Sequence, residues 1–223
     1  MYILYGGDFT RALVTEMVMA EGGISYELRE VDIVNDGHRT PEFLKINPAG
    51  WVPALITPEG EHLYETPAIN LYLAERHALT HLVPPETDND RGRFLSGFFF
   101  LAGDLEPVIK RVFYAHRFVL RPDDEQQARQ MATDTALERL RVIEAKIGAG
   151  GPYFLGERFS LIDLTLAYWV GALNRSGLLD EFAAIQNAVG LVRARPKLGT
   201  HFDRIDEARV KYAELQGRGE GVK

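Results

Sequence analysis

Few residues of this chain have the chemistry that a reaction needs, and cysteine is not among them. The 223-residue sequence has no cysteine, which excludes disulfides, thiolate metal sites and a cysteine nucleophile of its own. His116 and His201 lack neighbours at metal-ligand spacing, so we expect no metal site. The segment Glu65-Thr66-Pro67 opens a predicted helix, with Thr66 expected as its N-cap and Pro67 as its first residue. Free N–H groups and the helix dipole make such a start suitable for a carboxylate.

Short strands and helices must position that helix start. In the first 80 residues, short apolar or alternating runs are followed by segments with helical spacing of apolar residues. Glycine pairs at 6–7 and 22–23 close the first strand and the first helix. The predicted order is β-α-β-α-β-β-α, with a hairpin around residues 58–60. The predicted strands cover 2–5, 26–33, 52–57 and 62–64, and the predicted helices cover 10–21, 41–45 and 66–77.

Charge divides the chain as well. Residues 1–80 contain 5 Lys/Arg and 12 Asp/Glu, whereas residues 81–223 contain 20 of each. The segment 81–90 has two prolines and a polar cluster, which is typical of a linker, and only helical patterns follow it. We therefore predict two domains, 1–80 and 91–223, joined by 81–90. The predicted helices of the second domain cover 94–112, 123–148, 160–174, 178–194 and 196–213.

Charge and hydropathy also exclude some classes of partner. The net charge is −7 and neither part of the chain is basic, so nucleic acid and anionic membrane surfaces are not expected partners. The longest charge-free apolar stretch, 94–103, is about half of the ~20 residues that cross a bilayer. No signal peptide is evident in the first residues, MYILYGGDF. We expect a soluble, cytoplasmic protein.

Three segments contain motifs that can be recognised: Asn47–Leu55 (NPAGWVPAL), Tyr64–Ile69 (YETPAI) and Gly151–Asp163 (GPYFLGERFSLID). Together with the order of elements, they resemble the cytosolic glutathione S-transferase superfamily. The resemblance implies an α/β plus all-α fold, with an N-terminal thioredoxin-like domain and a C-terminal helical bundle. It also implies that glutathione is the co-substrate and that the protein is a homodimer. The absence of cysteine matches a bacterial member with a serine- or threonine-type active site.

The first two motifs imply a glutathione site. In this superfamily the Val-Pro bond is cis, and the main chain at the position of Val52 pairs with the cysteinyl backbone of glutathione. The resemblance therefore implies a cis bond before Pro53. It also places the γ-glutamyl carboxylate at the helix start of Thr66 and the γ-glutamyl ammonium on Glu65. Trp51 departs from the Lys, Gln or Arg of many relatives, and its role is either to cover the tripeptide or to pack at a dimer contact.

Thr10 is the first candidate for stabilising the glutathione thiolate. A free thiol with a pKa of about 8.5 is only about 3% ionised at pH 7, so a donor must favour the thiolate. Aligning the first strand and helix with the superfamily places Thr10 where serine-type classes have their serine. The alternative is that Thr10 merely caps the helix. Tyr5 and Arg11 are further candidate donors, and Asp8 is expected to cap the helix.

Other residues are assigned more loosely by the same resemblance. Three basic residues are near enough in sequence to meet the glycyl carboxylate: His38, Arg39 and Lys45. The electrophile pocket is expected to draw on Phe9, Phe98, Arg111, Tyr114 and Ala115. The run at 98–100 covers a wide helical arc, which favours a homodimer contact or a ligand contact for one of its three phenylalanines.

The third motif is expected to be structural. Ser160 and Asp163 have the spacing of a capping box in its aspartate form, with Phe159 and Leu164 at the staple positions. We expect Asp163 to be buried at the start of an apolar helix and to bind no ligand.

These residues together predict a glutathione transferase, in which the thiolate attacks a small hydrophobic electrophile. A glutathione-dependent isomerase, peroxidase or dehalogenase on the same scaffold is the first alternative. Isomerases of this superfamily often have a first helical turn rich in Ser and Cys. Residues 8–11 of this chain contain neither. A non-catalytic glutathione-binding or regulatory relative is the second alternative. Classes that form a mixed disulfide through their own cysteine are excluded.

Overall fold

The computed structural model describes residues 1–8, 10–173 and 177–217. The chain divides into two compact units. The first unit combines Met1–Leu79 with the described residues from Arg193 onward, and the second unit is Thr80–Val192. Each unit has its own set of fully buried apolar side chains, such as Leu4 and Met17 in the first and Phe98 in the second.

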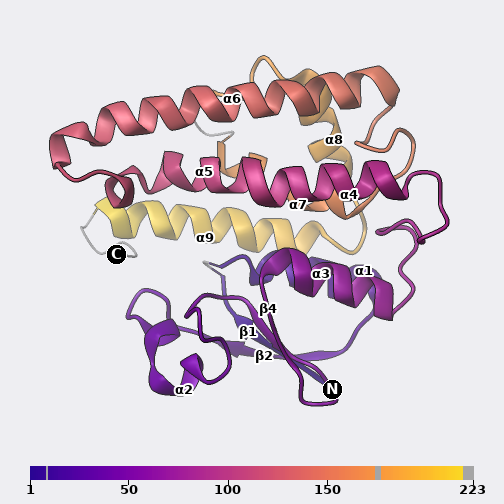
Figure 1. Ribbon diagram of the computed structural model, residues 1–223, viewed down its shortest axis with the longest axis horizontal. Helices are drawn as coiled ribbons and strands as arrows, with labels where there is room; N and C mark the ends of the chain where they lie inside the picture. Colours follow the sequence, from indigo (N-terminus) through magenta and orange to yellow (C-terminus); the bar gives the residue numbers. More distant parts are fainter. Residues whose placement is uncertain (9, 174–176, 218–223) are drawn as a thin grey trace. The chain divides into compact units, whose positions relative to one another are not determined.

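A four-stranded mixed sheet forms the centre of the first unit (Figure 1). Its strands are β1 (Tyr2–Gly6), β2 (Tyr26–Glu30), β3 (Ala54–Ile56) and β4 (His62–Tyr64), in the order β2-β1-β3-β4. β1 and β2 are parallel, and β3 is antiparallel to β1 and β4. β2 ends before the predicted residue 33 because its partner β1 ends at Gly6, which is opposite Glu30. β3 begins only after Pro53, which has no N–H to give to a ladder.

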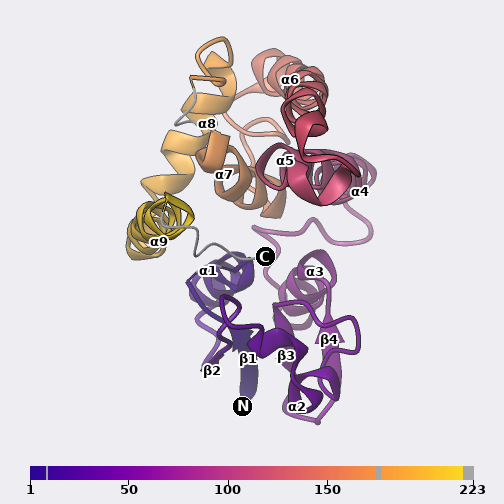
Figure 2. The same ribbon diagram turned by 90° about the vertical axis from the view of Figure 1, so that its left-hand side faces the viewer.

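Three helices connect these strands: α1 (Ala12–Gly22), α2 (Pro41–Leu44) and α3 (Thr66–Arg76), with a 3₁₀ turn at Gly37–Arg39. α1 and α3 lie side by side (Figure 2) and are joined by the buried Thr15 hydroxyl, which donates to Asn70 at 2.8 Å. Residues of β1 alternate between buried and half-buried, as expected for a strand with different layers on its two faces. On the second face, the Phe43 ring of α2 lies 6.0 Å from the Tyr5 ring.

The last helix, α9 (Gly199–Gly217), groups with the first unit, whereas the predicted second domain includes it. Ion pairs connect α1 with this helix and with the segment that precedes it. Arg204 of α9 donates to Glu16 at 2.9 Å, and Arg195 donates two hydrogen bonds to Glu21 at 2.7 and 2.9 Å. Both glutamates are buried, so losing either arginine would leave a charge inside the unit without its main partner.

The second unit is helical. Its helices are α4 (Arg91–Phe100), α5 (Glu106–Phe113), α6 (Glu125–Gly150), α7 (Leu161–Leu173) and α8 (Ala183–Arg193), with 3₁₀ turns at Ala115–Phe118 and Pro122–Asp124. A π turn at Leu101–Leu105 interrupts the helix predicted over 94–112, because Pro107 has no N–H for the carbonyl of Gly103. The predicted helix end at Asn174 lies outside the described residues. Within those residues, no helix is long and apolar enough to cross a membrane.

The start of α7 is closed by its own side chains. The Asp163 carboxylate accepts from the N–H groups of Phe154 and Ser160 at 2.8 Å each, and from the Ser160 hydroxyl at 2.9 Å. The same hydroxyl accepts from the N–H of Ile162 at 3.3 Å. Asp163 is 1% exposed, and its burial raises its pKa to about 6. The predicted capping box and the predicted burial of Asp163 are confirmed.

Candidate functional site

The sheet register brings three segments to one edge of the first unit. Tyr5 of β1 is opposite Ala54 of β3, and Ala54 is opposite Tyr64 of β4. Because neighbouring strands here are antiparallel, β1 and β4 end at the level where β3 begins. The segments at this edge are Gly6–Asp8 with Thr10, Asn47–Pro53 and Glu65–Thr66. These segments contain all six residues that the sequence assigns to catalysis or glutathione binding.

Asn47 holds the loop that precedes β3 in shape. Its buried amide donates to the carbonyl of Trp51 at 2.6 Å and accepts from the N–H of Ala49 at 3.0 Å. Gly50, with φ of 63°, makes the turn that these two bonds enclose. No role was expected for Asn47 from the sequence. Its signal was the Asn-Pro pair, because asparagine side chains commonly bond backbone groups two residues further on.

The loop ends at Val52 and Pro53, and the peptide bond between them is cis. Val52 is half-buried and Pro53 is buried. Val52 lies just outside the ladder, since the first paired residue of β3 is Ala54. A main chain at this place can pair with an extended peptide, as in β-strand addition.

Trp51 is exposed, and the guanidinium of Arg39 stacks on its ring. Its side chain is 48% exposed, and the guanidinium of Arg39 lies 4.4 Å from its ring centroid. The buried His38 ring also stacks on it, at 6.0 Å and an interplanar angle of 24°. Arg39 donates to the carbonyl of Ala49 at 3.3 Å, which ties it to the same loop. Lys45, the third basic candidate, is exposed beyond the end of α2.

The start of α3 differs from the prediction by one residue. Ile69 donates its N–H to the carbonyl of Glu65 at 3.0 Å, so Glu65 is the N-cap. The expectation that Thr66 is the N-cap and Pro67 the first helical residue is therefore wrong; Thr66 is the first helical residue and Pro67 the second.

Two features of this helix start are unusual. Glu65 has φ of 70° and ψ of 112°, outside the regions that non-glycine residues prefer, and its side chain makes no capping bond. The Thr66 hydroxyl is buried and has no hydrogen-bond partner among the residues that the structure describes. Strained backbone and an unsatisfied buried hydroxyl are each unfavourable, and they concentrate at sites of function.

Thr10 uses both functions of its hydroxyl within the chain. The side chain is 5% exposed; its Oγ1 donates to the carbonyl of Gly7 at 2.8 Å and accepts from the N–H of Ala12 at 3.2 Å. The hydroxyl therefore caps the first turn of α1. To donate a hydrogen bond to a ligand, the hydroxyl must turn its proton away from the carbonyl of Gly7, because it has one hydrogen to donate.

The alternative donors have different surroundings. The Tyr5 hydroxyl accepts from Arg29 at 2.9 Å, and its ring packs on the α2 face of the sheet. Arg11 is half-buried at the N-cap of α1. Phe9, a predicted pocket residue, lies outside the described residues.

An ion cluster that the sequence did not predict lies beside the first of the three segments. Arg204 donates to Asp8 at 2.7 and 3.2 Å and to Glu16 at 2.9 Å. Tyr26 donates its hydroxyl to Glu16 at 2.8 Å, and burial together with this bond raises its pKa. Asp8 therefore forms an ion pair rather than the predicted cap. The described residues 193–217 contain six basic and four acidic residues, so the first unit has a net charge of −5, compared with −7 for residues 1–80.

The other predicted pocket residues lie in the second unit and differ in exposure. Phe98 is 1% exposed and stacks on Phe94 at 5.5 Å, and Ala115 is also buried, so both belong to the helical core. Arg111 is exposed, with its guanidinium 5.6 Å from the Phe118 ring. Tyr114 is half-buried.

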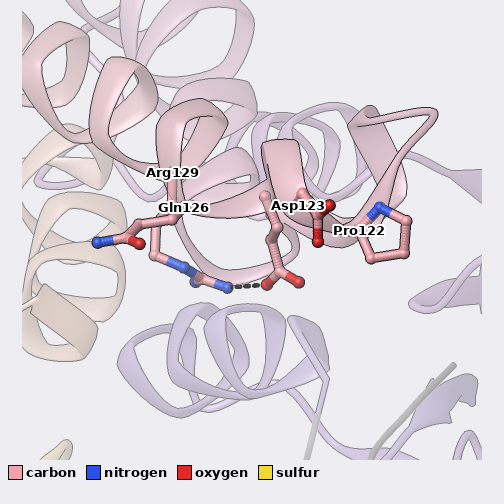
Figure 3. A pocket seen from close by; sticks show the side chains of 5 residues that line it. Pro122, Asp123, Gln126 and Arg129 are labelled. Atoms are coloured by element: carbon pink, nitrogen blue, oxygen red, sulfur yellow. Dashed lines mark hydrogen bonds and ion pairs between the residues drawn. The ribbon is translucent and has the colours of Figure 1, made fainter.

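A pocket in the second unit lies elsewhere. It has a volume of ≈ 450 Å³ at the start of α6, where Arg129 donates to Glu125 at 2.5 Å (Figure 3). Its lining is Pro122, Asp123, Glu125, Gln126 and Arg129. This polar lining contains none of the residues predicted from the sequence, and we give it no part in the site.

Comparison with known proteins identifies the class. Residues 11–76 match the family model of the glutathione S-transferase N-terminal domain, and residues 126–204 match that of the C-terminal domain. The chain is 33% identical over 193 residues to maleylacetoacetate isomerase of Pseudomonas aeruginosa, covering 84% of this chain and 88% of the relative. The chain therefore belongs to the glutathione S-transferase superfamily.

Two further relatives have a different named activity or a bound ligand. The chain is 28% identical to the disulfide-bond oxidoreductase YfcG of Escherichia coli, covering 82% of this chain and 86% of the relative. A solved glutathione transferase homologue from Sulfitobacter, with bound glutathione, is 25% identical, with a TM-score of 0.81. That likeness covers 92% of this chain and 98% of the other. The predicted fold class, a thioredoxin-like domain followed by a helical domain, is confirmed.

Proposed function

We propose that this chain binds glutathione at the described sheet edge and transfers it to a small hydrophobic electrophile. The observation that carries the proposal is the start of α3. A buried hydroxyl without a partner follows a strained glutamate there, and a helix start favours an anion. The γ-glutamyl group of glutathione offers a carboxylate for Thr66 and the helix start, and an ammonium for Glu65.

The rest of the tripeptide follows the sheet edge in this proposal. The cysteinyl backbone pairs with the main chain of Val52, before Pro53. Arg39, held over Trp51, supplies the cation for the glycyl carboxylate, and Trp51 covers the tripeptide. The support for this arrangement is the 4.4 Å stacking of Arg39 on Trp51, which places a cation beside the loop.

Thr10 stabilises the sulfur in the proposed reaction. Its hydroxyl turns from the carbonyl of Gly7 to the thiolate and keeps the bond from Ala12. Lowering the thiol pKa by about 2 raises the thiolate fraction at pH 7 from about 3% to roughly 75%. The thiolate then forms a bond to the electrophilic carbon, and the leaving group departs with the electron pair of the broken bond. Arg11 is the alternative donor, because it lies at the N-cap of the same helix.

Two measurements test the proposal. The protein should be retained on immobilised glutathione, and bound glutathione should show the ultraviolet band of a thiolate at pH 7. Absence of retention would overturn the proposed site. Retention without the band would favour the non-catalytic relative. A Thr10→Ala variant that keeps the band and its pH midpoint would reduce Thr10 to a cap and leave Arg11 as the donor to test.

A glutathione-dependent isomerase is the second candidate, favoured by the 33% identity to a maleylacetoacetate isomerase. An isomerase adds and then releases the thiol, so it regenerates glutathione, whereas a transferase consumes one glutathione for each product. Thiol titration during turnover separates the two. Equimolar loss of thiol supports the transferase, and constant thiol supports the isomerase.

We also propose a homodimer in the cytoplasm. Phe99 on α4 is 56% exposed, which supports a contact between copies of the chain on this helix. Light scattering of the eluted protein should give twice the chain mass of 25.1 kDa. A single-chain mass would contradict the dimer.

A further inference from the structure

The carboxylate of Asp8 joins the loop before Thr10 to a helix from the far end of the chain. Asp8 accepts from Nη2 and Nε of Arg204, at 2.7 and 3.2 Å. Arg204 is itself fixed, because its Nη1 donates to the buried Glu16 at 2.9 Å. A guanidinium that spans two carboxylates is a rigid fork rather than a loose surface charge.

This ion pair acts on the backbone that Thr10 uses. Asp8 shares a peptide unit with Gly7, and the carbonyl of Gly7 accepts both the hydroxyl and the N–H of Thr10, at 2.8 and 3.0 Å. Gly7 has φ of 143°, so its own backbone has the freedom of glycine and does little to fix that carbonyl. The side chain of Asp8 is therefore an anchor on the peptide unit that contains the acceptor for the Thr10 hydroxyl.

We propose that Arg204, through Asp8, is a positioning residue for the Thr10 hydroxyl and so sets the pKa of the bound glutathione thiol. This inference rests on the proposed glutathione chemistry. The last helix, α9, thus supports the sulfur site from within the first unit without any need for Arg204 to touch the sulfur.

A simple charge effect would have the opposite sign. Asp8 is negative, so replacing it with a neutral residue would by itself stabilise a nearby thiolate and lower the thiol pKa. If Asp8 instead anchors the loop, its replacement loosens the Thr10 hydroxyl and raises the thiol pKa. The direction of the change therefore distinguishes positioning from background charge.

The test uses Asp8→Asn, because Asp8 is 45% exposed and its replacement leaves the pair of the buried Glu16 and the half-buried Arg204 intact. We expect the pH midpoint of the thiolate band to rise by about 1 and kcat at pH 6.5 to fall about fivefold. The dissociation constant for glutathione should change less than twofold, since the proposed contacts to the tripeptide backbone and its two carboxylates lie outside residues 6–10. A midpoint that is unchanged or lower would overturn the inference.

Asp206→Asn is the matched control. Asp206 is 46% exposed and pairs in the same unit with Arg193 at 2.5 Å and with Arg209 at 3.5 Å. It should leave the midpoint unchanged; an equal rise in both variants would show a general effect of lost ion pairs and overturn the inference.

Arg204→Lys provides an independent arm, because lysine keeps a cation for Glu16 but cannot fork to Asp8. It should raise the midpoint as Asp8→Asn does, and the double variant should add nothing further. Additive shifts would overturn the inference. A wild-type protein that binds no glutathione, or binds it without a thiolate band, would instead remove the proposed function on which the inference rests.

Discussion

The starts of α3 and α7 contain the same two kinds of side chain, a hydroxyl and a carboxylate, yet only one start is closed. At α7, Asp163 and Ser160 satisfy one another and three N–H groups. At α3, within the described part of the chain, the Thr66 hydroxyl has no hydrogen-bond partner and Glu65 makes no capping bond. A helix start that its own side chains fill contributes to folding, whereas one that they leave open is available to a ligand.

Substitution at the closed start of α7 should lower the stability of the protein more than substitution at the open start of α3. Asp163→Ala leaves two buried N–H groups and the Ser160 hydroxyl without their acceptor, so we expect a loss of about 3 kcal/mol in the free energy of unfolding. Urea denaturation followed by circular dichroism measures this loss. If the variant unfolds within about 0.5 kcal/mol of the wild type, α7 does not depend on its cap.

The same carboxyl should make stability depend on pH. Because the pKa of Asp163 is about 6 in the folded chain against 3.8 for an ordinary aspartate, the folded chain holds a proton that the unfolded chain has lost between these values. Its contribution to stability is therefore full below about pH 4 and is lost as the pH rises through about 6. Relative to Asp163→Asn, the wild type should lose about 2 to 3 kcal/mol between pH 4 and 6.5. A difference that is flat or grows with pH contradicts this assignment.

Substitution at the open start of α3 should change the affinity for glutathione and leave the stability of the protein unchanged. Glu65→Gln removes the charge that pairs with the γ-glutamyl ammonium, and we expect about 30-fold weaker glutathione binding, equivalent to about 2 kcal/mol. Because Glu65 is exposed, the unfolding midpoint should stay within error. Glu61→Gln, on the exposed turn before β4, is the control and should bind normally. Equal affinity of the two variants would remove Glu65 from the site.

The smallest expected effect distinguishes the Thr66 hydroxyl at the start of α3 from the Ser160 hydroxyl at the start of α7. Thr66→Val should weaken glutathione binding about fivefold and leave stability equal or slightly higher, because an unsatisfied buried hydroxyl is removed. Ser160→Ala should do the reverse, with about 1 kcal/mol less stability and unchanged affinity. Calorimetric titration and urea denaturation of both variants check the pair. If both behave alike, the distinction between an open and a closed start does not hold.

The local sequence pattern predicted most of the helices and strands, and it predicted the helix cap whose partners are close together in the sequence. The capping box at Ser160 and Asp163 could be predicted because its partners lie within a few residues of one another. The N-cap of α3 could not, because a one-residue shift depends on the backbone angle of Glu65, which no propensity fixes. The loop anchor Asn47 was missed although its signal is local.

Long-range partners were beyond the sequence pattern. Arg204 meets Asp8 across 196 positions of the chain, and no periodicity in either segment indicates the other. Charge counted over 1–80 overstated the negative background of that unit, because Arg193, Arg195 and Lys197 join it from far along the chain. The predicted domain limits and the roles of the site residues stay predictions, because they depend on ligand contacts and on packing between elements.

The central claim is that the open start of α3 binds the γ-glutamyl group of glutathione. Calorimetric titration of the wild-type chain with glutathione and, separately, with the dipeptide Cys-Gly tests it most directly, because the dipeptide lacks only that group. The account predicts one glutathione per chain and at least about 100-fold weaker binding of the dipeptide. Absence of glutathione binding, or equal affinity for the two peptides, would contradict it.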